Sequence, residues 1–185
     1  MDQASLEIPY VEARNRVTTL VRMFMAIPHT IVLYVLNLVV QVMTVVHWFI
    51  QVFTGRRNPG ISGFVRKFLA YQAEVGAYLG LLYDEYPGFF DDQAKTPVRY
   101  SLDVSEGPVN RMSVALRIIF AIPAMIIGML YGIAAGVLTL VSWIAIVVTG
   151  KHPKGMWDFL YKANRYFAQL NAYIHLLTDA TPKAG

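Results

Sequence analysis

The sequence predicts an all-α integral membrane bundle of two tandem repeats, each an apolar helical stretch followed by an amphipathic interfacial helix. Three observations predict it: the apolar composition, two long uncharged segments and an internal repeat. Apolar residues make up 56% of the chain and charged residues 15%, against about 45–50% and about 25% in soluble domains. No Asp, Glu, Lys or Arg occurs from Met23 to Gly55 or from Ile118 to Gly150. Each segment exceeds the roughly 18 apolar residues of a candidate membrane span.

The chain repeats itself at a constant offset of 95 residues, from Asn15 to Asn110. The matched positions include rare residue types: Ala26-Ile27-Pro28 and Ala121-Ile122-Pro123, Trp48 and Trp143, Thr54-Gly55 and Thr149-Gly150, Tyr71 and Tyr166, Tyr78 and Tyr173, and Asp84 and Asp179. Self-similarity at a fixed period indicates duplicated structural units. We therefore predict an N-terminal segment at 1–14, a first repeat at 15–87, a linker at 88–109, a second repeat at 110–179 and a C-terminal tail at 180–185.

The apolar stretch of each repeat admits two arrangements. Residues 17–54 would extend about 57 Å as one helix at about 1.5 Å per residue, whereas the hydrocarbon core of a bilayer is about 30 Å thick. Basic residues bracket both ends of each stretch, and the positive-inside tendency places such ends on the cytoplasmic side. This favours a helical hairpin with turns near Asn37 and Gly132, giving four crossings and both termini inside. The alternative is one long kinked span per repeat, with inverted repeats.

One helical face of the apolar stretch differs between the copies. The first copy presents amide and hydroxyl groups there, and the second presents mostly small residues: Asn37, Gln41, Thr44, Trp48 and Gln51 correspond to Gly132, Gly136, Thr139, Trp143 and Ile146. Gly128 extends the small residues into a doubled small-xxx-small pattern, which lets helix backbones approach closely. We predict that the glycine face packs against the amide face, so that Asn37 and Gln41 bond to backbone carbonyls and Thr139. The alternative is a polar pathway or ligand pocket lined by these groups.

The segment after each Thr-Gly is amphipathic. In the first copy, apolar residues from Phe64 to Leu82 recur every three or four positions, with Arg66 and Lys67 on the other side. Tyr, Trp and basic residues favour the headgroup boundary of a membrane. We therefore predict a helix on the cytoplasmic membrane surface in each copy. The residues predicted to be interfacial are Trp48, Trp143, Tyr71, Tyr78, Tyr166, Tyr173, Arg56 and Arg57.

Residues typical of catalysis or metal binding are sparse. The four histidines have no metal-ligand spacing, and no nucleophile or phosphate-loop motif occurs. His47 lies in the apolar stretch, where a hydrogen-bonded core histidine is the simpler interpretation than a metal or haem ligand. Asp84 and Asp179 match between the copies, which favours helix-end capping or pairing with the basic residues that open each repeat. We predict no enzyme activity, no catalytic or metal-binding residues and no cofactor other than bound lipid.

The repeat resembles a bacterial membrane family known only as a domain of unknown function, number four-three-eight-nine. The residues that carry the resemblance in the first copy are Ala26-Ile27-Pro28-His29, Thr54-Gly55-Arg56, Ala77-Tyr78, Leu81-Leu82, Asp84 and Tyr86-Pro87. The second copy carries Thr149-Gly150-Lys151-His152-Pro153, Ala172-Tyr173 and Leu176-Leu177-Thr178-Asp179. It departs from the pattern with Ala124 in place of His29 and without a terminal Tyr-Pro, which argues against a histidine role shared by both copies. The resemblance implies a membrane location but no particular activity.

These features together predict a non-catalytic accessory subunit of a larger membrane complex. The predicted partners are membrane lipids and other integral membrane subunits, in a multi-pass arrangement in the bacterial inner membrane with cytoplasmic termini. Nucleic acid is not a predicted partner, because the basic residues flank apolar stretches, where a membrane protein needs them. The alternative, from a different class, is a small channel, transporter or lipid-handling protein that acts as a homo-oligomer.

Overall fold

The computed structural model describes residues 3–90, 96–104 and 107–183. The remaining residues fall in the predicted N-terminal segment, linker and C-terminal tail, and lie outside the described part. The described chain forms five helices and one two-stranded ribbon. In chain order these are β1 (Ser5–Glu7), α1 (Arg16–Thr54), α2 (Pro59–Leu79), β2 (Arg99–Ser101), α3 (Arg111–Ala115), α4 (Arg117–Thr149) and α5 (Lys154–Ile174).

The boundaries of the long helices follow from residues that recur in both copies. The side chain of Asn15 accepts hydrogen bonds from the backbone amides of the first turn of α1, and Asn110 does the same for α3. These bonds satisfy amides that a helix start leaves without partners. Gly55 and Gly150 end α1 and α4 in the left-handed conformation, with φ of 72° and 75°, which glycine adopts without steric cost.

The predicted helical hairpins do not form. Helix α1 runs without interruption through Asn37 over 39 residues, and α4 runs through Gly132 over 33 residues. The sequence around Asn37 is rich in Val, Leu and Met and offers no turn residues, so nothing there opposes a continuous helix. Pro28 and Pro123 are both accommodated inside the helices. Of the two arrangements considered, the structure therefore has one long helix per copy rather than a hairpin.

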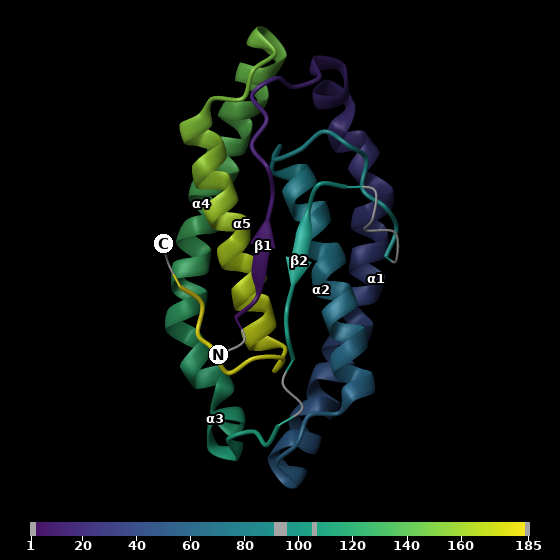
Figure 1. Ribbon diagram of the computed structural model, residues 1–185, viewed down its shortest axis with the longest axis vertical. Helices are drawn as coiled ribbons and strands as arrows, with labels where there is room; N and C mark the ends of the chain where they lie inside the picture. Colours follow the sequence, from purple (N-terminus) through teal and green to yellow (C-terminus); the bar gives the residue numbers. More distant parts are fainter. Residues whose placement is uncertain (1–2, 91–95, 105–106, 184–185) are drawn as a thin grey trace.

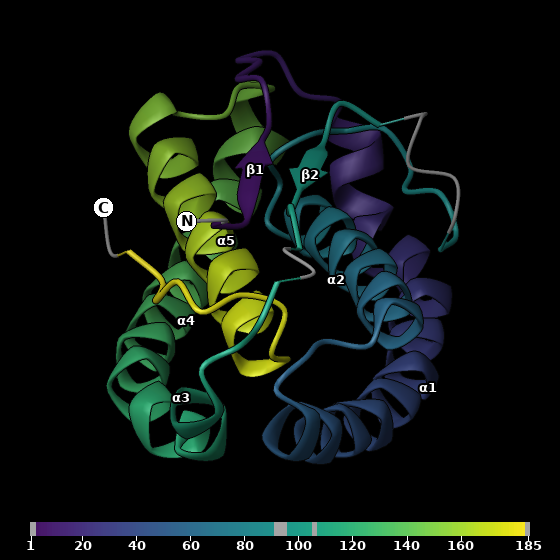
Figure 2. The same cartoon turned by 60° about the horizontal axis from the view of Figure 1, so that its bottom comes forward.

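The elements form three layers. The β1–β2 ribbon, antiparallel with Leu6 opposite Tyr100, lies across α2 and α5 in front of the molecule in Figure 1. Helices α2 and α5 lie side by side behind it, and α1 and α4 form the outer layer on the far side, bowed away from each other (Figure 2). The ribbon was not predicted, because its two three-residue strands lie in segments that read as polar linkers. It covers one face of the helical layer and leaves the outer face of α1 and α4 open.

The polarity of the long helices is inverted relative to a soluble bundle. Large apolar side chains are exposed along the whole outer side of both helices, including Phe24 at 75% and Ile118 at 76%. The inner side of α1 instead buries polar groups, among them Arg22, His47 and Gln51. Both helices are long and apolar enough to cross a membrane.

Candidate functional site

A buried arginine organises the first copy. Arg22 is 2% exposed and donates from Nη1 to the carbonyl oxygens of Tyr78 and Tyr83, both at 2.7 Å. Its Nη2 pairs with Oδ1 of Asp84 at 2.6 Å. The guanidinium also lies over the ring of Tyr78, 4.4 Å from the centroid. The cation therefore joins the start of α1 to the end of α2 and the turn that follows it.

The second copy builds the same centre at the matching positions. Arg117 donates from Nη1 to the carbonyl of Thr178 at 3.1 Å, lies 4.2 Å from the centroid of Tyr173 and pairs with Asp179. Of the two roles expected for Asp84 and Asp179, helix-end capping and pairing with the basic entry residues, the structure shows the pairing. Buried cations are tolerated only when paired and hydrogen-bonded. We therefore assign both centres a structural role.

The two copies make matching contacts with each other, as an approximate two-fold rotation between them (the pseudo-two-fold relation) requires. Trp48 donates from Nε1 to the carbonyl of Val114 at 3.0 Å, and Trp143 donates to the carbonyl of Thr19 at 2.9 Å. The end of each long helix therefore contacts the start of the other copy, so α1 and α4 are antiparallel. A Cβ on Gly55 would lie 2.8 Å from Nε of Arg111. The long Arg111 side chain could move aside, so the positive φ of Gly55, rather than this contact, is what favours glycine at this position.

A second pair of contacts uses different chemistry at equivalent positions. Arg57 donates from Nε to the carbonyl of Leu176 at 3.2 Å, and the matching residue His152 bonds through Nδ1 to the carbonyl of Leu81 at 3.1 Å. Both leucines have positive φ, 61° and 64°, so a hydrogen bond at each carbonyl fixes an unfavourable turn. Burial, followed by the charge of Arg14, lowers the pKa of His152 to about 4. This imidazole is neutral near pH 7.

The predicted interfacial tyrosines are in fact core residues. Tyr71 and Tyr78 are fully buried, and Tyr166 and Tyr173 are 2% exposed. They fill the space between the helical layers because α2 and α5 are covered on both sides, which the sequence pattern alone does not reveal. Of the other predicted interfacial residues, Trp48 and Trp143 are half-buried, Arg56 is exposed, and Arg57 is buried and pairs with Asp179 at 3.0 Å.

The position beside the matched tyrosines differs between copies. In the first copy Nδ1 of His29 lies 2.7 Å from the Tyr71 hydroxyl, and its ring stacks on Phe89 with a centroid distance of 4.5 Å. In the second copy Ala124 replaces this histidine, and the Tyr166 hydroxyl donates to the Ala124 carbonyl at 2.8 Å. In the first copy, His29 therefore supplies the hydrogen-bond partner of the tyrosine hydroxyl, and in the second copy a backbone carbonyl supplies it.

His47 is hydrogen-bonded within the protein. Its Nε2 accepts from the backbone amide of Asn58 at 3.2 Å and lies 3.0 Å from Nε2 of Gln51. Gln51 also donates to the Leu176 carbonyl at 3.3 Å. Within the described residues, no group of three or more His, Asp or Glu side chains could hold a metal ion.

The amide and glycine faces do not meet as predicted. A Cβ on Gly128 would contact Leu170, Tyr166 and Phe167, and one on Gly132 would contact Phe167. The glycine face of α4 thus packs against α5 rather than against α1. The remaining predicted residues are scattered: Thr44 bonds to His175 at 2.8 Å, Asn37 is half-buried, and Gln41 and Gly136 are exposed. The glycines leave space on α4, and bulky aromatic side chains of α5 fill this space better than the amide side chains of α1 would.

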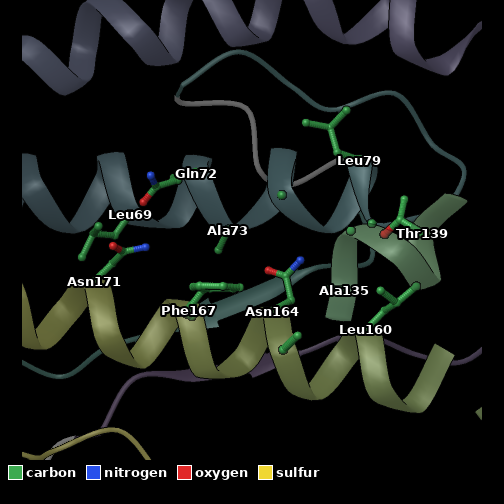
Figure 3. Close-up of a pocket in the computed structure, with 15 residues that line it drawn as sticks. Leu69, Gln72, Ala73, Leu79, Ala135, Thr139, Leu160, Asn164, Phe167 and Asn171 are labelled. Carbon is green, nitrogen blue, oxygen red and sulfur yellow. The ribbon is translucent and has the colours of Figure 1, made fainter. Parts of the chain in front are cut away.

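A pocket of about 490 Å³ opens between α2, α5 and the middle of α4. Figure 3 shows its polar side chains, which are Gln72 from α2, Asn164 and Asn171 from α5, and Thr139 from α4. Apolar side chains complete the lining, with Leu69, Leu79, Leu160 and Phe167 among them. The volume falls in the range of ligand pockets, about 300–1,000 Å³.

Matching positions of α2 and α5 line the pocket, but the residues at these positions differ between the copies. Gln72 corresponds to Phe167, Leu69 to Asn164, and Gly76 to Asn171. Gly136 and Thr139 are the two pocket residues that the sequence pattern also predicts as site residues. The spacing of Asn164, Phe167 and Asn171 on one helical face was a usable signal. This arrangement can bind an uncharged or weakly polar group through amides inside an apolar cavity.

Comparison with known proteins identifies the repeated unit. The family model described as a domain of unknown function (DUF4389) matches residues 16–91 and again residues 111–184. No curated protein and no solved structure matches the chain. The two matched segments cover most of the chain and coincide with the two structural copies. The chain therefore belongs to the DUF4389 family and carries two tandem copies of its domain.

Proposed function

We propose that this chain is embedded in a bacterial cytoplasmic membrane through α1 and α4, with both termini on the cytoplasmic side. The support is the inverted polarity of the long helices, which expose apolar side chains and bury Arg22 and His47. In water an apolar surface of this extent promotes association or aggregation, whereas lipid accommodates it. Arg56 and Lys151, which follow the two long helices, fit the cytoplasmic excess of basic residues.

Extraction of isolated membranes tests the embedding. The tagged chain should stay in the membrane pellet after washes with high salt and with alkaline carbonate, and detergent should release it. A peripheral protein held by charge leaves the membrane in high salt, because salt screens that attraction. Recovery of folded chain in the soluble fraction of lysed cells would contradict the proposed embedding.

Within that membrane, the chain acts as a non-catalytic accessory subunit of a larger assembly. The observation that supports this role is a pair of amides on the outer part of α1. Asn37 is half-buried and Gln41 is exposed, and neither side chain is hydrogen-bonded to another described residue. Hydrocarbon offers no partner for an amide. A polar group on a neighbouring subunit would satisfy both side chains.

Co-purification tests the accessory role. The tagged chain, extracted gently, should bring a defined set of membrane proteins at fixed stoichiometry. The double variant Asn37→Leu and Gln41→Leu should lower their recovery about tenfold, the effect of losing about 1.4 kcal/mol of binding free energy. The matched control changes exposed apolar neighbours, Leu38→Val and Val42→Leu, and should keep the partners. Purification of the chain alone, or as a homo-oligomer, would rule out this role.

The pocket favours a second candidate, the binding of a lipid-like amphiphile. The amides of Gln72, Asn164 and Asn171 would bond the polar group of such a molecule, and Phe167 and Leu160 would contact its apolar chain. The double variant Asn164→Leu and Asn171→Leu should lower the amount of co-purifying lipid, measured by mass spectrometry of the purified protein. Lys162→Ala, an exposed position on the same helix, is the control. Equal lipid content in both variants would exclude this candidate.

A further inference from the structure

The face of the molecule opposite the long helices is charged at mid-length. Glu7 and Arg99 face each other across the β1–β2 ribbon, and both are exposed. The ribbon crosses the middle of the molecule in Figure 1. Lys67 and its counterpart Lys162 are exposed near the middle of α2 and α5. A band of charge therefore lies half-way along the long axis.

The apolar surface extends along the full length of the same axis. On α1 the exposed large apolar side chains begin at Val17 and end at Phe53, and on α4 they begin at Ile118 and end at Val148. Helix α1 alone is about 58 Å long at about 1.5 Å per residue, nearly twice the thickness of a hydrocarbon core of about 30 Å. To fit within that core, a straight crossing would need a tilt near 60°, outside the usual range of about 0–40°.

A crossing orientation is incompatible with this pattern of charge. If the long axis spanned the bilayer, the exposed side chains of Lys67, Lys162, Glu7 and Arg99 would lie near the midplane of the membrane. Charged groups at that depth are costly and are found facing a bundle interior or water, not lipid. The open sheet edges of the ribbon would also meet lipid, where backbone groups have no hydrogen-bonding partner.

Rotating the molecule by a quarter turn, so that its long axis lies in the membrane plane, removes both conflicts. We infer that α1 and α4 lie parallel to the membrane plane, embedded in the hydrocarbon of the cytoplasmic leaflet, while the ribbon faces the cytoplasm. In Figure 2 the ribbon and the long helices lie on opposite sides of α2 and α5, as this orientation requires. Arg56 and Lys151, at opposite ends of the molecule, then both reach anionic headgroups of one leaflet.

This orientation rests on the proposed membrane embedding but makes a separate prediction about sidedness. The chain contains no cysteine, so single-cysteine variants carry no background label. Arg56→Cys and Lys151→Cys are matched positions of the two repeats and lie at opposite ends of the long axis. A membrane-impermeant maleimide should label both variants in inverted cytoplasmic-membrane vesicles and neither in right-side-out vesicles.

The outcomes separate the two proposals. Labelling of Arg56→Cys and Lys151→Cys from opposite faces would establish a crossing and overturn the in-plane orientation, while the embedding would stand. Absence of the chain from both kinds of vesicle would instead overturn the embedding, and the orientation with it. Separation in the presence of detergent, on a size-exclusion column, confirms that each variant folds as the parent chain does.

A second set of variants measures depth rather than sidedness. Lys67→Cys and Lys162→Cys, at exposed positions near the middle of α2 and α5, should label in inverted vesicles without detergent, whereas a crossing orientation would hide them at the midplane. Leu38→Cys and Ile133→Cys are matched exposed positions on the outer face of α1 and α4. These two should label only after detergent is added. Labelling of Leu38→Cys and Ile133→Cys in intact vesicles would overturn the assignment of this face to hydrocarbon.

Discussion

The two copies share one framework and differ at the positions beside it. Both centre on a buried arginine, Arg22 or Arg117, that pairs with an aspartate after the amphipathic helix. The copies differ at other positions of the repeat, where His29 corresponds to Ala124 and Arg57 to His152. The repeated residues fix each unit and join it to its partner. The residues unique to one copy are therefore the better candidates for function, and the unequal lining of the pocket is the largest such difference.

The largest expected effect separates the two arginine centres. Arg22→Met should destabilise the protein by about 3–5 kcal/mol, because the buried carbonyls of Tyr78 and Tyr83 lose their donor at about 1–3 kcal/mol each. Arg117→Met should cost about 1 kcal/mol less, because Arg57 still pairs with Asp179 and one fewer carbonyl loses its donor. Denaturant unfolding in detergent micelles measures both. A larger loss for Arg117→Met would contradict this ranking of the copies.

The next effect concerns acid sensitivity at one pair of matched positions, Arg57 and His152. The pKa of His152 is about 4 in the folded protein and about 6.5 when unfolded. As pH falls below 6.5 the unfolded chain takes up the proton first, so stability declines until the pH reaches about 4. The full loss is about 3–4 kcal/mol at about 1.4 kcal/mol per pKa unit.

The variant His152→Gln checks this effect by comparison with the parent chain. It should flatten the stability profile between about pH 6.5 and about pH 4, as measured by denaturant unfolding across that range. Arg57 occupies the matching position in the first copy. An unchanged profile in His152→Gln would assign the acid sensitivity to other buried groups.

A smaller effect tests the histidine of the first copy. His29→Ala removes the partner of the buried Tyr71 hydroxyl and should cost about 1–3 kcal/mol. Adding Tyr71→Phe should restore part of the loss, because no buried hydroxyl then lacks a partner. Tyr166→Phe is the matched control in the second copy, where the released group is a backbone carbonyl. Thermal unfolding of the parent chain, His29→Ala, Tyr71→Phe and the double variant decides whether the two positions are coupled.

The smallest effect is expected at the surface. Lys151 and Glu12 form an ion pair at 3.1 Å in which both side chains are more than half exposed. Exposed pairs contribute about 0–1 kcal/mol. Lys151→Ala should therefore change the unfolding midpoint little, and less at high salt. A loss comparable to that of the arginine centres would show that the connection between the copies depends on this charge.

The sequence by itself determined the duplication, the helical content and where each apolar stretch begins and ends, but not whether one helix or two fill that stretch. The constant offset, the capping asparagines and the terminal glycines are local signals, and each acts within a few residues of its position. For Asp84 and Asp179 the sequence left two roles open, helix-end capping and pairing with basic entry residues, and the structure shows the pairing. The family match and the two long apolar helices agree with those predictions.

Only the tertiary structure decided how far each helix continues and what each face contacts. A hairpin and a single long helix share the same local pattern, so the absence of a turn at Asn37 could not be read from periodicity. The four tyrosines, from Tyr71 to Tyr173, resemble interfacial residues in sequence, yet packing of α2 against α1 and of α5 against α4 buries them. The pocket residues Gln72, Asn164 and Asn171 come together across the pseudo-two-fold relation. Such contacts depend on the relative placement of whole helices, which no short sequence pattern encodes.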